Sequence, residues 1–205
     1  MPTSPAGARR RTQAERTATS AERLRRALAE LIAEQGYERT TAAQVGERAG
    51  YSRAMVRERY GSKDALLDAL HRSYEDALLG GDAASGSGLD RALAGVDRLH
   101  AFATEHPVLL RAIFVASFEA AGAAQVVRPT VLRWLDELAG RARTWLAAGI
   151  DDGSVRADLD VAAEAERFLD EAIAGGYRWV IAPDAVDYPE RLRAWRAAMA
   201  ARWAA

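Results

Sequence analysis

The sequence predicts an all-α protein made of a small N-terminal head and a larger C-terminal helical domain. Three observations predict this fold. Apolar residues recur at spacings of three and four along most of the 205 residues, whereas alternating strand patterns and runs of β-branched residues are nearly absent. Ser or Thr followed three positions later by Glu or Gln marks several helix starts. Glycines follow the ends of several periodic stretches, where helices commonly terminate.

The chain begins with a polar segment that precedes a first helix. Residues 1–18 include Pro, Gly and an Arg triplet, so we expect a disordered tail. Thr19 and Glu22 have the spacing of a capping box, and apolar residues then repeat with helical spacing up to Gly36. We therefore predict a head that comprises residues 19–79 and whose first helix starts near Thr19.

Residues 41–60 contain two short helical patterns around one Gly-containing turn. Thr41 and Gln44 can form a capping box at the start of the first helix. Gly50 can adopt the left-handed conformation that ends this helix, and Ser52 can then cap the second. Two short helices joined in this way are the sequence form of a helix-turn-helix, a motif that binds duplex DNA.

The second helix of this motif, predicted at 52–60, has one inner and one exposed face. At about 100° per residue, Val56 and Tyr60 lie together and would pack on the first helix. Flanking arginines suit phosphates, and small central side chains let a helix lie deep in a major groove. Glu58 could accept a hydrogen bond from a cytosine amino group, or it could remain a solvent-facing residue neutralised by an arginine. The predicted DNA contacts of this helix are Ser52, Arg53, Ala54, Met55, Arg57, Glu58 and Arg59.

The run GYERTTAAQVGERAGYSRAMVRERYGSKDALL, residues 36–67, resembles the N-terminal domain of the tetracycline-repressor (TetR) family of bacterial transcriptional regulators. The match is ordered and free of gaps. Gly46 stands where the family prefers Ala, Tyr51 where it prefers Val, and Arg57 where it usually has a phosphate-binding Tyr. The family positions that the chain fills are Gly36-Tyr37, Thr41, Val45, Ala49-Gly50, Ser52, Val56, Tyr60, Ser62-Lys63 and Leu66.

The resemblance implies a DNA-binding regulator, in most cases a repressor, that binds a palindromic operator as a homodimer and releases it when a small effector binds. It also implies that Lys63, at the start of the next helix, meets a phosphate; Lys63 could instead cap that helix in solvent together with Ser62. We add Thr41 to the predicted DNA contacts. A different class stays open, namely a DNA-binding dimer without a small-molecule effector that acts constitutively or through a protein partner.

The distribution of charge agrees with a DNA-binding head. The whole chain has a net charge of −1, but residues 1–63 carry 13 Lys and Arg against 7 Asp and Glu, a net +6. Residues 64–205 carry 15 against 22, a net −7. This asymmetry is typical of a nucleic-acid-binding domain joined to an acidic body, although chance and an Arg-rich tail could also produce it. The Arg triplet at 9–11 could enter a minor groove or attract phosphates without specificity.

The remainder of the chain is predicted to form one connecting helix, a linker and then a series of helices. Residues 63–79 form a predicted helix that connects the head with the rest of the chain. The Gly/Ser stretch at 80–88 is a predicted flexible linker, and residues 89–205 would form the effector-binding and dimerisation domain. Its predicted helices are 89–105, 107–121, 125–149, 160–181 and 187–204.

Apolar stripes on the last two predicted helices indicate a dimer interface. One stripe includes Ile173 and Tyr177, and the other includes Trp195, Met199 and Trp203. These side chains could pack within one chain. They could also form a four-helix interface between two copies, which would supply the two-fold axis that a palindromic operator requires.

The middle helices carry the candidate effector pocket. Aromatic side chains there are interspersed with polar groups that could orient a ligand, although an apolar stripe of this kind could equally be ordinary core. The predicted pocket residues are His100, Phe102, Phe114, Ser117, Phe118 and Trp134, with Glu119 and Arg128 as further polar candidates. We expect a small, largely apolar or aromatic effector, mainly because the resemblance implies one.

Composition argues against several other classes of protein. The chain has no cysteine, so disulfides, thiolate metal sites and thiol catalysis are excluded. His71, His100 and His106 are its only histidines, and none has metal-site spacing or lies beside a nucleophile motif. The sequence has no Gly-rich phosphate loop and no apolar run long enough for a signal peptide or a membrane span. We therefore expect a cytoplasmic protein that is not an enzyme, needs no cofactor or metal and does not bind membranes.

Overall fold

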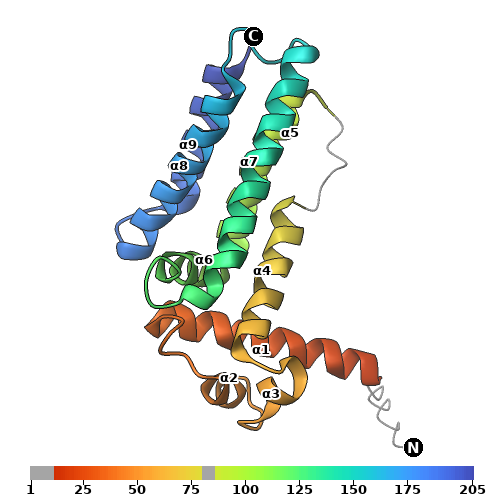
Figure 1. The fold of residues 1–205 in the computed structure, drawn as a ribbon, viewed down its shortest axis with the longest axis vertical. Helices are drawn as coiled ribbons and strands as arrows, with labels where there is room; N and C mark the ends of the chain where they lie inside the picture. The colour runs from red at the N-terminus through yellow and green to blue at the C-terminus, as the bar shows by residue number, and fades with distance from the viewer. Residues whose placement is uncertain (1–11, 80–85) are drawn as a thin grey trace, which may run out of the picture.

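Helices joined by short turns make up the structure, a computed structural model that describes residues 12–79 and 86–205 (Figure 1). These described residues contain no β-strand, and one isolated bridge joins Val155 to Ala204. The predicted all-α fold is confirmed. The helices are α1 (Gln13–Gln35), α2 (Ala42–Arg48), α3 (Met55–Tyr60), α4 (Lys63–Leu79), α5 (Gly88–Glu105), α6 (Pro107–Glu119), the 3₁₀ helix η1 (Gln125–Val127), α7 (Arg128–Asp151), α8 (Val161–Ile181) and α9 (Tyr188–Trp203).

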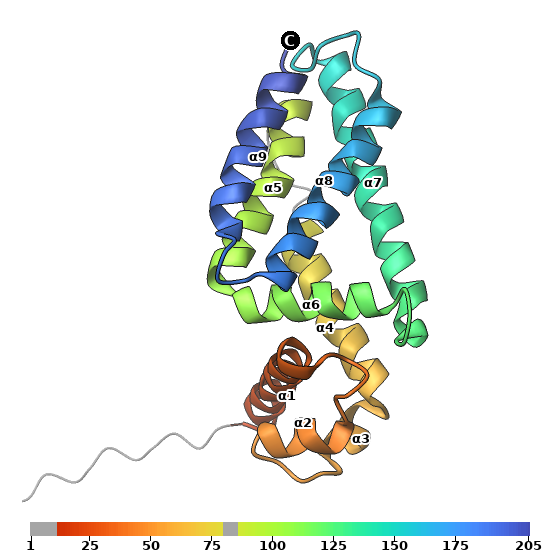
Figure 2. The same cartoon turned by 90° about the vertical axis from the view of Figure 1, so that its left-hand side faces the viewer.

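The helices are arranged as a head and a body (Figures 1 and 2). Helices α1, α2 and α3 form the head, and α4 rises from it toward the body. In the body, α5 packs against α7 and α9, and α8 packs against α7 and α9. Figure 2 shows α6 lying across the base of these four upright helices, next to α1 of the head.

Helix α1 begins inside the segment predicted as a disordered tail. Thr12 accepts the N–H of Glu15 at 3.2 Å, and the Glu15 carboxylate accepts the N–H of Thr12 at 2.7 Å, which forms a capping box. Thr19, the predicted cap, lies within the helix and donates its hydroxyl to the Glu15 carbonyl at 2.8 Å. The prediction of disorder was therefore wrong for residues 12–18, whose Gln, Ala, Glu and Arg are polar or small but favour helix. Residues 1–11, with the Arg triplet, lie outside the described residues.

Helix α3 is shorter than the predicted second helix of the motif. It begins at Met55, whose N–H donates to the Ser52 carbonyl at 3.1 Å, and no side chain caps its start. The prediction that Ser52 caps this helix was wrong, because residues 52–54 form a turn packed against α2. A Cβ at Gly46 would lie only 2.3 Å from the Ser52 carbonyl oxygen, so this close approach requires glycine in α2.

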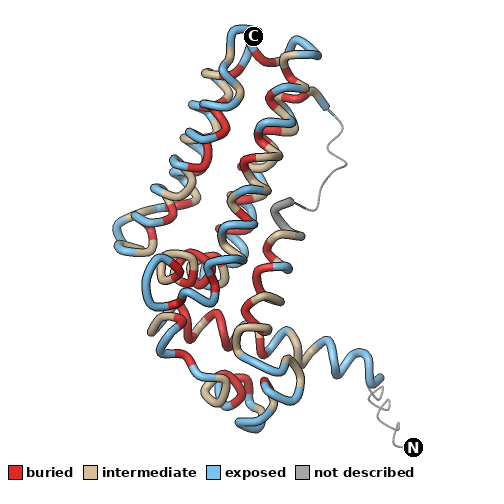
Figure 3. Tube along the Cα trace, viewed as in Figure 1, coloured by how far each residue is buried: buried red, intermediate tan, exposed pale blue. Residues whose placement is uncertain are grey.

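The core of the head continues into the body. Buried apolar residues of α1, α2, α3 and α4 form one cluster with Ala112 and Ala116 of α6 and with Ala120, the residue that follows it. These alanines are four residues apart and share one face, so their short side chains let α6 lie close to α1. Figure 3 shows buried residues both in the head and in the α6 region above it. Packing, and not only the chain of α4, therefore connects head and body.

Two further clusters fill the body. The lower cluster is rich in aromatic rings, and it contains Tyr74, Phe102, Phe114, Trp134, Trp179 and Tyr188. The upper cluster contains Leu93, Val96, Leu146, Phe168, Met199 and Trp203. Helix α8 approaches the lower cluster closely at Gly176, where a Cβ would lie 2.4 Å from the Phe114 ring.

The predicted linker is partly helical. Ser87 and Asp90 form a capping box that starts α5 at Gly88, and Gly88 is buried against Gly149 of α7. Residues 80–85 of the predicted linker lie outside the described residues. The helices predicted beyond this point are present, with bounds shifted by a few residues. Within the described ranges, no single helix is long and apolar enough to cross a membrane, although α5 and α6 together, bent by 110°, have the length and composition.

Candidate nucleic-acid interface and effector cavity

Helices α2 and α3 form the predicted two-helix unit. The Thr41 hydroxyl accepts the N–H of Gln44 at 3.2 Å, and the Gln44 side chain accepts the N–H of Thr41 at 2.8 Å, so the predicted capping box is confirmed. Gly50 has a φ of 78°, the left-handed conformation expected at the end of the first helix. Val45 and Val56 are buried between the helices and α1. The opposite face of α3 is thereby directed outward.

The outward surface formed by α3 and the turn before it contains four of the predicted DNA contacts. Arg53, Ala54, Arg57 and Glu58 are exposed, whereas Met55 is partly buried against the core of the head. Arg53 forms an ion pair with Glu47 of α2 at 2.5 Å, with its side chain 77% exposed. Such an exposed pair contributes little stability, so Arg53 can leave Glu47 and bind a phosphate.

Two other predicted phosphate contacts are directed into the head. Arg59 donates to the Ser20 hydroxyl and to the Thr17 carbonyl of α1, both at 2.7 Å. Lys63 donates to the Tyr37 carbonyl at 2.9 Å and lies 3.8 Å from the centre of the Tyr37 ring. Burial lowers the pKa of Lys63, an effect that nearby carboxylates partly oppose. Both side chains thus stabilise the head itself, a role that the sequence alone did not indicate.

A carboxylate from the body holds the turn that precedes α2. Glu119, at the end of α6, accepts the N–H of Tyr37 at 2.9 Å and that of Glu38 at 3.1 Å. Gly36 leaves room for it, because a Cβ there would lie 2.2 Å from a Glu119 oxygen. From the sequence, Glu119 is expected only to orient a ligand. Its partners are about 80 positions away, so no local pattern could have identified this joint between head and body.

A small, largely enclosed cavity lies in the body between α4, α5, α6, α7, α8 and α9. Its volume is about 40 Å³, little more than the space of one water molecule. Of the predicted pocket residues, Phe114 and Trp134 line it. The indole N–H of Trp134 is buried and has no hydrogen-bond partner among the described residues. The other lining residues are Tyr74, Gly95, Val96, Leu99, Leu135, Leu138, Trp145, Phe168, Leu169, Ala172, Ile173 and Trp195.

The other predicted pocket residues lie elsewhere. Phe118 stacks on Phe114 outside the cavity lining, with ring centres 5.9 Å apart, and Ser117 donates to a carbonyl of its own helix. His100 lies 3.2 Å from Arg193 at the surface. Phe102 lines a larger cleft of about 620 Å³ between head and body, whose walls come from α1, α4, α5 and α6. Because arginines and glutamates form much of this cleft, it is unlike the predicted apolar pocket.

The apolar stripe of α9 faces inward. Met199 and Trp203 are almost completely buried within the single chain, and Trp195 is partly buried against Phe168 with ring centres 5.1 Å apart. The prediction that Met199 and Trp203 form a dimer interface was wrong, because both pack on α5 and α8 of their own chain. Trp195 stays a predicted interface residue. Tyr177 of α8 is 52% exposed and remains a candidate.

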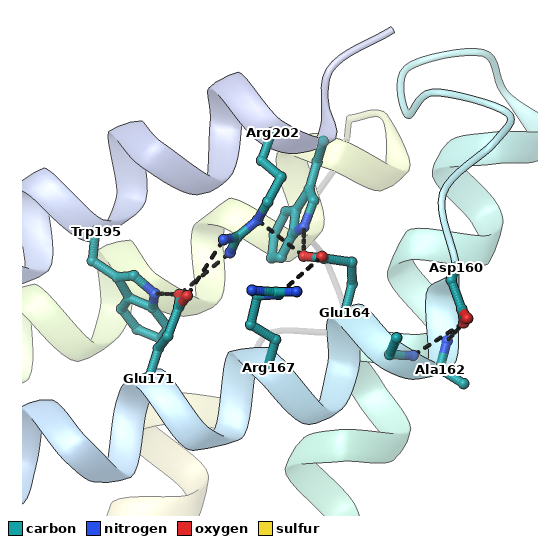
Figure 4. Close-up of polar contacts among 9 residues, drawn as sticks. Asp160, Ala162, Glu164, Arg167, Glu171, Trp195 and Arg202 are labelled. Carbon is teal, nitrogen blue, oxygen red and sulfur yellow. Dashed lines mark hydrogen bonds and ion pairs between the residues drawn. The ribbon is translucent and has the colours of Figure 1, made fainter.

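Two carboxylates of α8 bind the indoles of α9 (Figure 4). Glu164, itself buried, accepts the Trp203 indole N–H at 2.8 Å, and Glu171 accepts that of Trp195 at 2.5 Å. Arg202 bridges the two carboxylates, since its Nε lies 3.0 Å from Glu164 and one Nη lies 3.3 Å from Glu171. Helices α8 and α9 are therefore joined as one unit. Within the described ranges, no group of three His, Asp or Glu side chains is placed to hold a metal ion.

Comparison with known proteins agrees with this geometry. Residues 24–70 match the family model described as bacterial regulatory proteins, tetR family. No curated protein sequence matches the chain. Among solved structures, the SmeT–triclosan complex is 19% identical with a TM-score of 0.73, and the match covers 91% of this chain and 92% of that chain.

Two further solved structures are similar over almost their whole length. A TetR transcriptional regulator from Chloroflexus aurantiacus J-10-FL is 19% identical with a TM-score of 0.70, and the match covers 93% of this chain and 99% of that chain. A gamma-butyrolactone receptor, described as ArpA-like, is 20% identical with a TM-score of 0.63. The match covers 87% of this chain and 97% of that chain. At such identities the likeness shows a common fold.

Proposed function

We propose, from the premise that this chain belongs to the tetR family of bacterial regulatory proteins, that it is a repressor which binds a palindromic operator as a homodimer. The observation that supports this most directly is the outward surface of α3 and of the turn before it. Arg53 and Arg57 would bind phosphates on either side of a major groove, while Ala54 and Glu58 would face base edges. Two such helices about 34 Å apart would read successive half-sites.

The dimer would use the outer faces of α8 and α9. Tyr177 and Ile181 of α8 are large apolar residues that are 52% and 66% exposed. On α9, the face opposite the buried tryptophans carries exposed alanines, at 194, 197, 198 and 201. Short side chains there would let the helix of a second copy pack closely. Changing Ile181 to Glu should therefore produce a folded monomer, which light scattering with circular dichroism would detect.

The effector would enter the aromatic cavity. At about 40 Å³ the cavity must expand to admit any molecule larger than water, so binding has to move its walls. Aromatic side chains would contact a flat apolar ligand, and the unpartnered Trp134 indole would donate to one acceptor atom. The similar SmeT structure is a complex with triclosan, which supports a small aromatic effector.

Helix α6 would transmit that movement to the head. Phe114 lines the cavity, and Glu119 lies about one and a half turns further along the same helix. A displacement of α6 would pull the Glu119 carboxylate away from the turn at residues 36–38, which leads directly into α2. The two α3 helices would then lose the spacing that the operator requires, and DNA would be released because the two states differ in affinity.

Selection of bound fragments from random duplex DNA tests the regulatory proposal. We expect an inverted repeat whose half-sites are separated by about one helical turn. Recovery of no preferred sequence, or a protein that stays monomeric at every concentration, would overturn the proposal. A reporter gene downstream of the recovered repeat should be expressed less when the protein is present.

A second candidate is a DNA-binding dimer without an effector, and the small volume of the cavity favours it. Thermal-shift screening of metabolites and drugs separates the two functions. An effector at about 100 times its Kd should add roughly 2.7 kcal/mol to the apparent stability. The same compound must weaken operator binding, because a ligand that stabilises the protein without changing DNA affinity is not an effector.

A further inference from the structure

We propose that the groove between the first turns of α1 and helix α3 binds the phosphodiester backbone of duplex DNA, with Arg16 and Arg23 as its charged contacts. This inference rests on the proposed DNA binding, and it adds a second contact surface beside the recognition helix. Neither arginine belongs to the helix-turn-helix, and the sequence pattern of that motif does not point to them.

The first turns of α1 project from the rest of the head. Residues 12–18 are all exposed, so they contribute almost nothing to the core. Figure 1 shows this end of α1 extending beyond α2 and α3 on the side of α3. A projecting, capped helix end that buries no apolar side chains is suited to contact a partner molecule.

The groove beside this projection is lined by basic and neutral side chains only. It has a volume of about 400 Å³ and a wide opening to solvent. Arg16, Arg23 and Arg59 are its charged residues, and no carboxylate belongs to its lining. The acidic residues of this part of α1 are engaged elsewhere, because Glu15 caps the helix and Glu22 pairs with Arg25. The complete lining is Gln13, Arg16, Thr17, Thr19, Ser20, Arg23, Tyr51, Met55 and Arg59.

Arg16 and Arg23 are available for a ligand. Both are exposed, and neither forms an ion pair or a side-chain hydrogen bond within the described part of the chain. They are seven residues apart, so they lie on the same face of α1, about 10 Å apart along its axis. Successive phosphates of one DNA strand advance by about 3.4 Å along the duplex, so the two guanidinium groups could bind phosphates a few nucleotides apart.

Arg59 gives the groove a fixed shape. Its guanidinium donates to the Ser20 hydroxyl and the Thr17 carbonyl, both at 2.7 Å, and thus ties the projecting part of α1 to α3. Met55 forms part of the groove and also starts α3. The groove therefore adjoins the recognition face directly, and DNA seated on α3 would present a backbone to it. A linear polyanion fits this location better than a compact anion, which would need converging donors.

Salt titration of duplex binding tests the groove. A fluorescent duplex of random sequence would be titrated with wild type, Arg16→Ala, Arg23→Ala and the double variant at several salt concentrations, with anisotropy as the readout. Arg26→Ala is the matched control, because Arg26 is an exposed arginine of the same helix that lines the cleft on the body side. Circular dichroism checks that each variant keeps its helix content.

Each groove substitution should weaken binding about five- to tenfold near 0.1 M salt and reduce the slope of log K against log salt by about 0.9. In the double variant the slope should fall by about twice that amount, and Arg26→Ala should keep the wild-type slope. If wild type binds duplex DNA and the double variant has the same slope, the groove proposal is overturned while the proposed function stands. If Arg26→Ala loses as much slope as the groove variants, the proposal is likewise overturned. If wild type binds no duplex even at low salt, both proposals fail.

Discussion

The head and the α8–α9 pair hold their helices together by different means. In the head, α2 and α3 have only 7 and 6 residues, and isolated helices of that length are unstable in water. Their positions depend on backbone contacts, such as the approach of Gly46 to Ser52, and on side chains that bind backbone groups. In the α8–α9 pair, helices of 21 and 16 residues are joined by two indole–carboxylate hydrogen bonds, one buried and one partly buried.

The comparison shows where predictions from sequence patterns fail. In the head, Arg59 and Lys63 have the chemistry of phosphate contacts, but the structure uses them to hold α1 and the turn at Tyr37. In the α8–α9 pair, Met199 and Trp203 have the pattern of an interface, but one chain is enough to bury them. In both regions, residues that the sequence pattern predicts to contact DNA or a second copy instead hold the fold of the single chain together.

The largest expected effect is in the α8–α9 pair. Trp203→Ala should lower the free energy of unfolding by about 3–5 kcal/mol, because it leaves a large cavity and removes an indole donor from the buried Glu164 carboxylate. Urea unfolding would measure the change. Leu132→Ala, on an exposed site of α7, should change the free energy by less than about 0.5 kcal/mol. A stable Trp203→Ala protein that fails only to dimerise would restore the interface interpretation.

A backbone contact in the head gives the next largest effect. Gly46→Ala should destabilise the protein by about 1–3 kcal/mol, although alanine favours helix, because the new methyl group would collide with the Ser52 carbonyl. Gly140→Ala in α7 is the control, since a Cβ there meets nothing within 4 Å. Thermal unfolding should show that the control gains up to about 1 kcal/mol in its free energy of unfolding. A gain at both positions would mean that the turn after α2 adapts.

The contact between Glu119 of α6 and the turn of the head should have an intermediate effect. Glu119→Ala removes the acceptor of the Tyr37 and Glu38 amides and should cost about 1–2 kcal/mol. Hydrogen exchange at these two amides should become faster, whereas Glu105→Ala, at the exposed end of α5, should leave it unchanged. Unchanged exchange in Glu119→Ala would show that the joint does not depend on this carboxylate.

The smallest expected effect is a pH dependence of the α8–α9 pair. Burial alone would raise the pKa of Glu171, but hydrogen bonds from Arg202 and Trp195 outweigh it and hold the pKa below its ordinary value. Because the folded-state pKa is the lower one, Glu171 stabilises the protein above the ordinary glutamate range, and this contribution is lost as the pH falls through the folded-state pKa.

Stability measured between pH 6 and pH 3 should therefore fall less steeply in Glu171→Gln than in wild type. Exposed Glu166 offers the matched control, and Glu166→Gln should follow the wild-type profile closely. Identical slopes for Glu171→Gln and wild type would show that the carboxylate contributes no acid-sensitive stability.

Local signals were sufficient for most of the helices and for the motif. The capping box at Thr41, the left-handed Gly50 and the buried Val56 all agree with the structure, because each depends on residues within one or two turns. The predicted start of α1 is wrong, because residues 12–18 are polar and yet helical, with a capping box formed by Thr12 and Glu15. The candidate effector site was predicted less well, since only Phe114 and Trp134 line the cavity.

Helical periodicity, caps and the ordered motif are enough to predict an all-α DNA-binding regulator, since these signals act between neighbours along the chain. Which charged and aromatic side chains remain free for partners depends instead on how the helices pack. Arg57 stays exposed, Arg59 is tied to α1, and Trp203 is buried. That division depends on partners far away in sequence, such as Glu164 for Trp203 and Ser20 for Arg59, which folding alone brings within hydrogen-bonding distance.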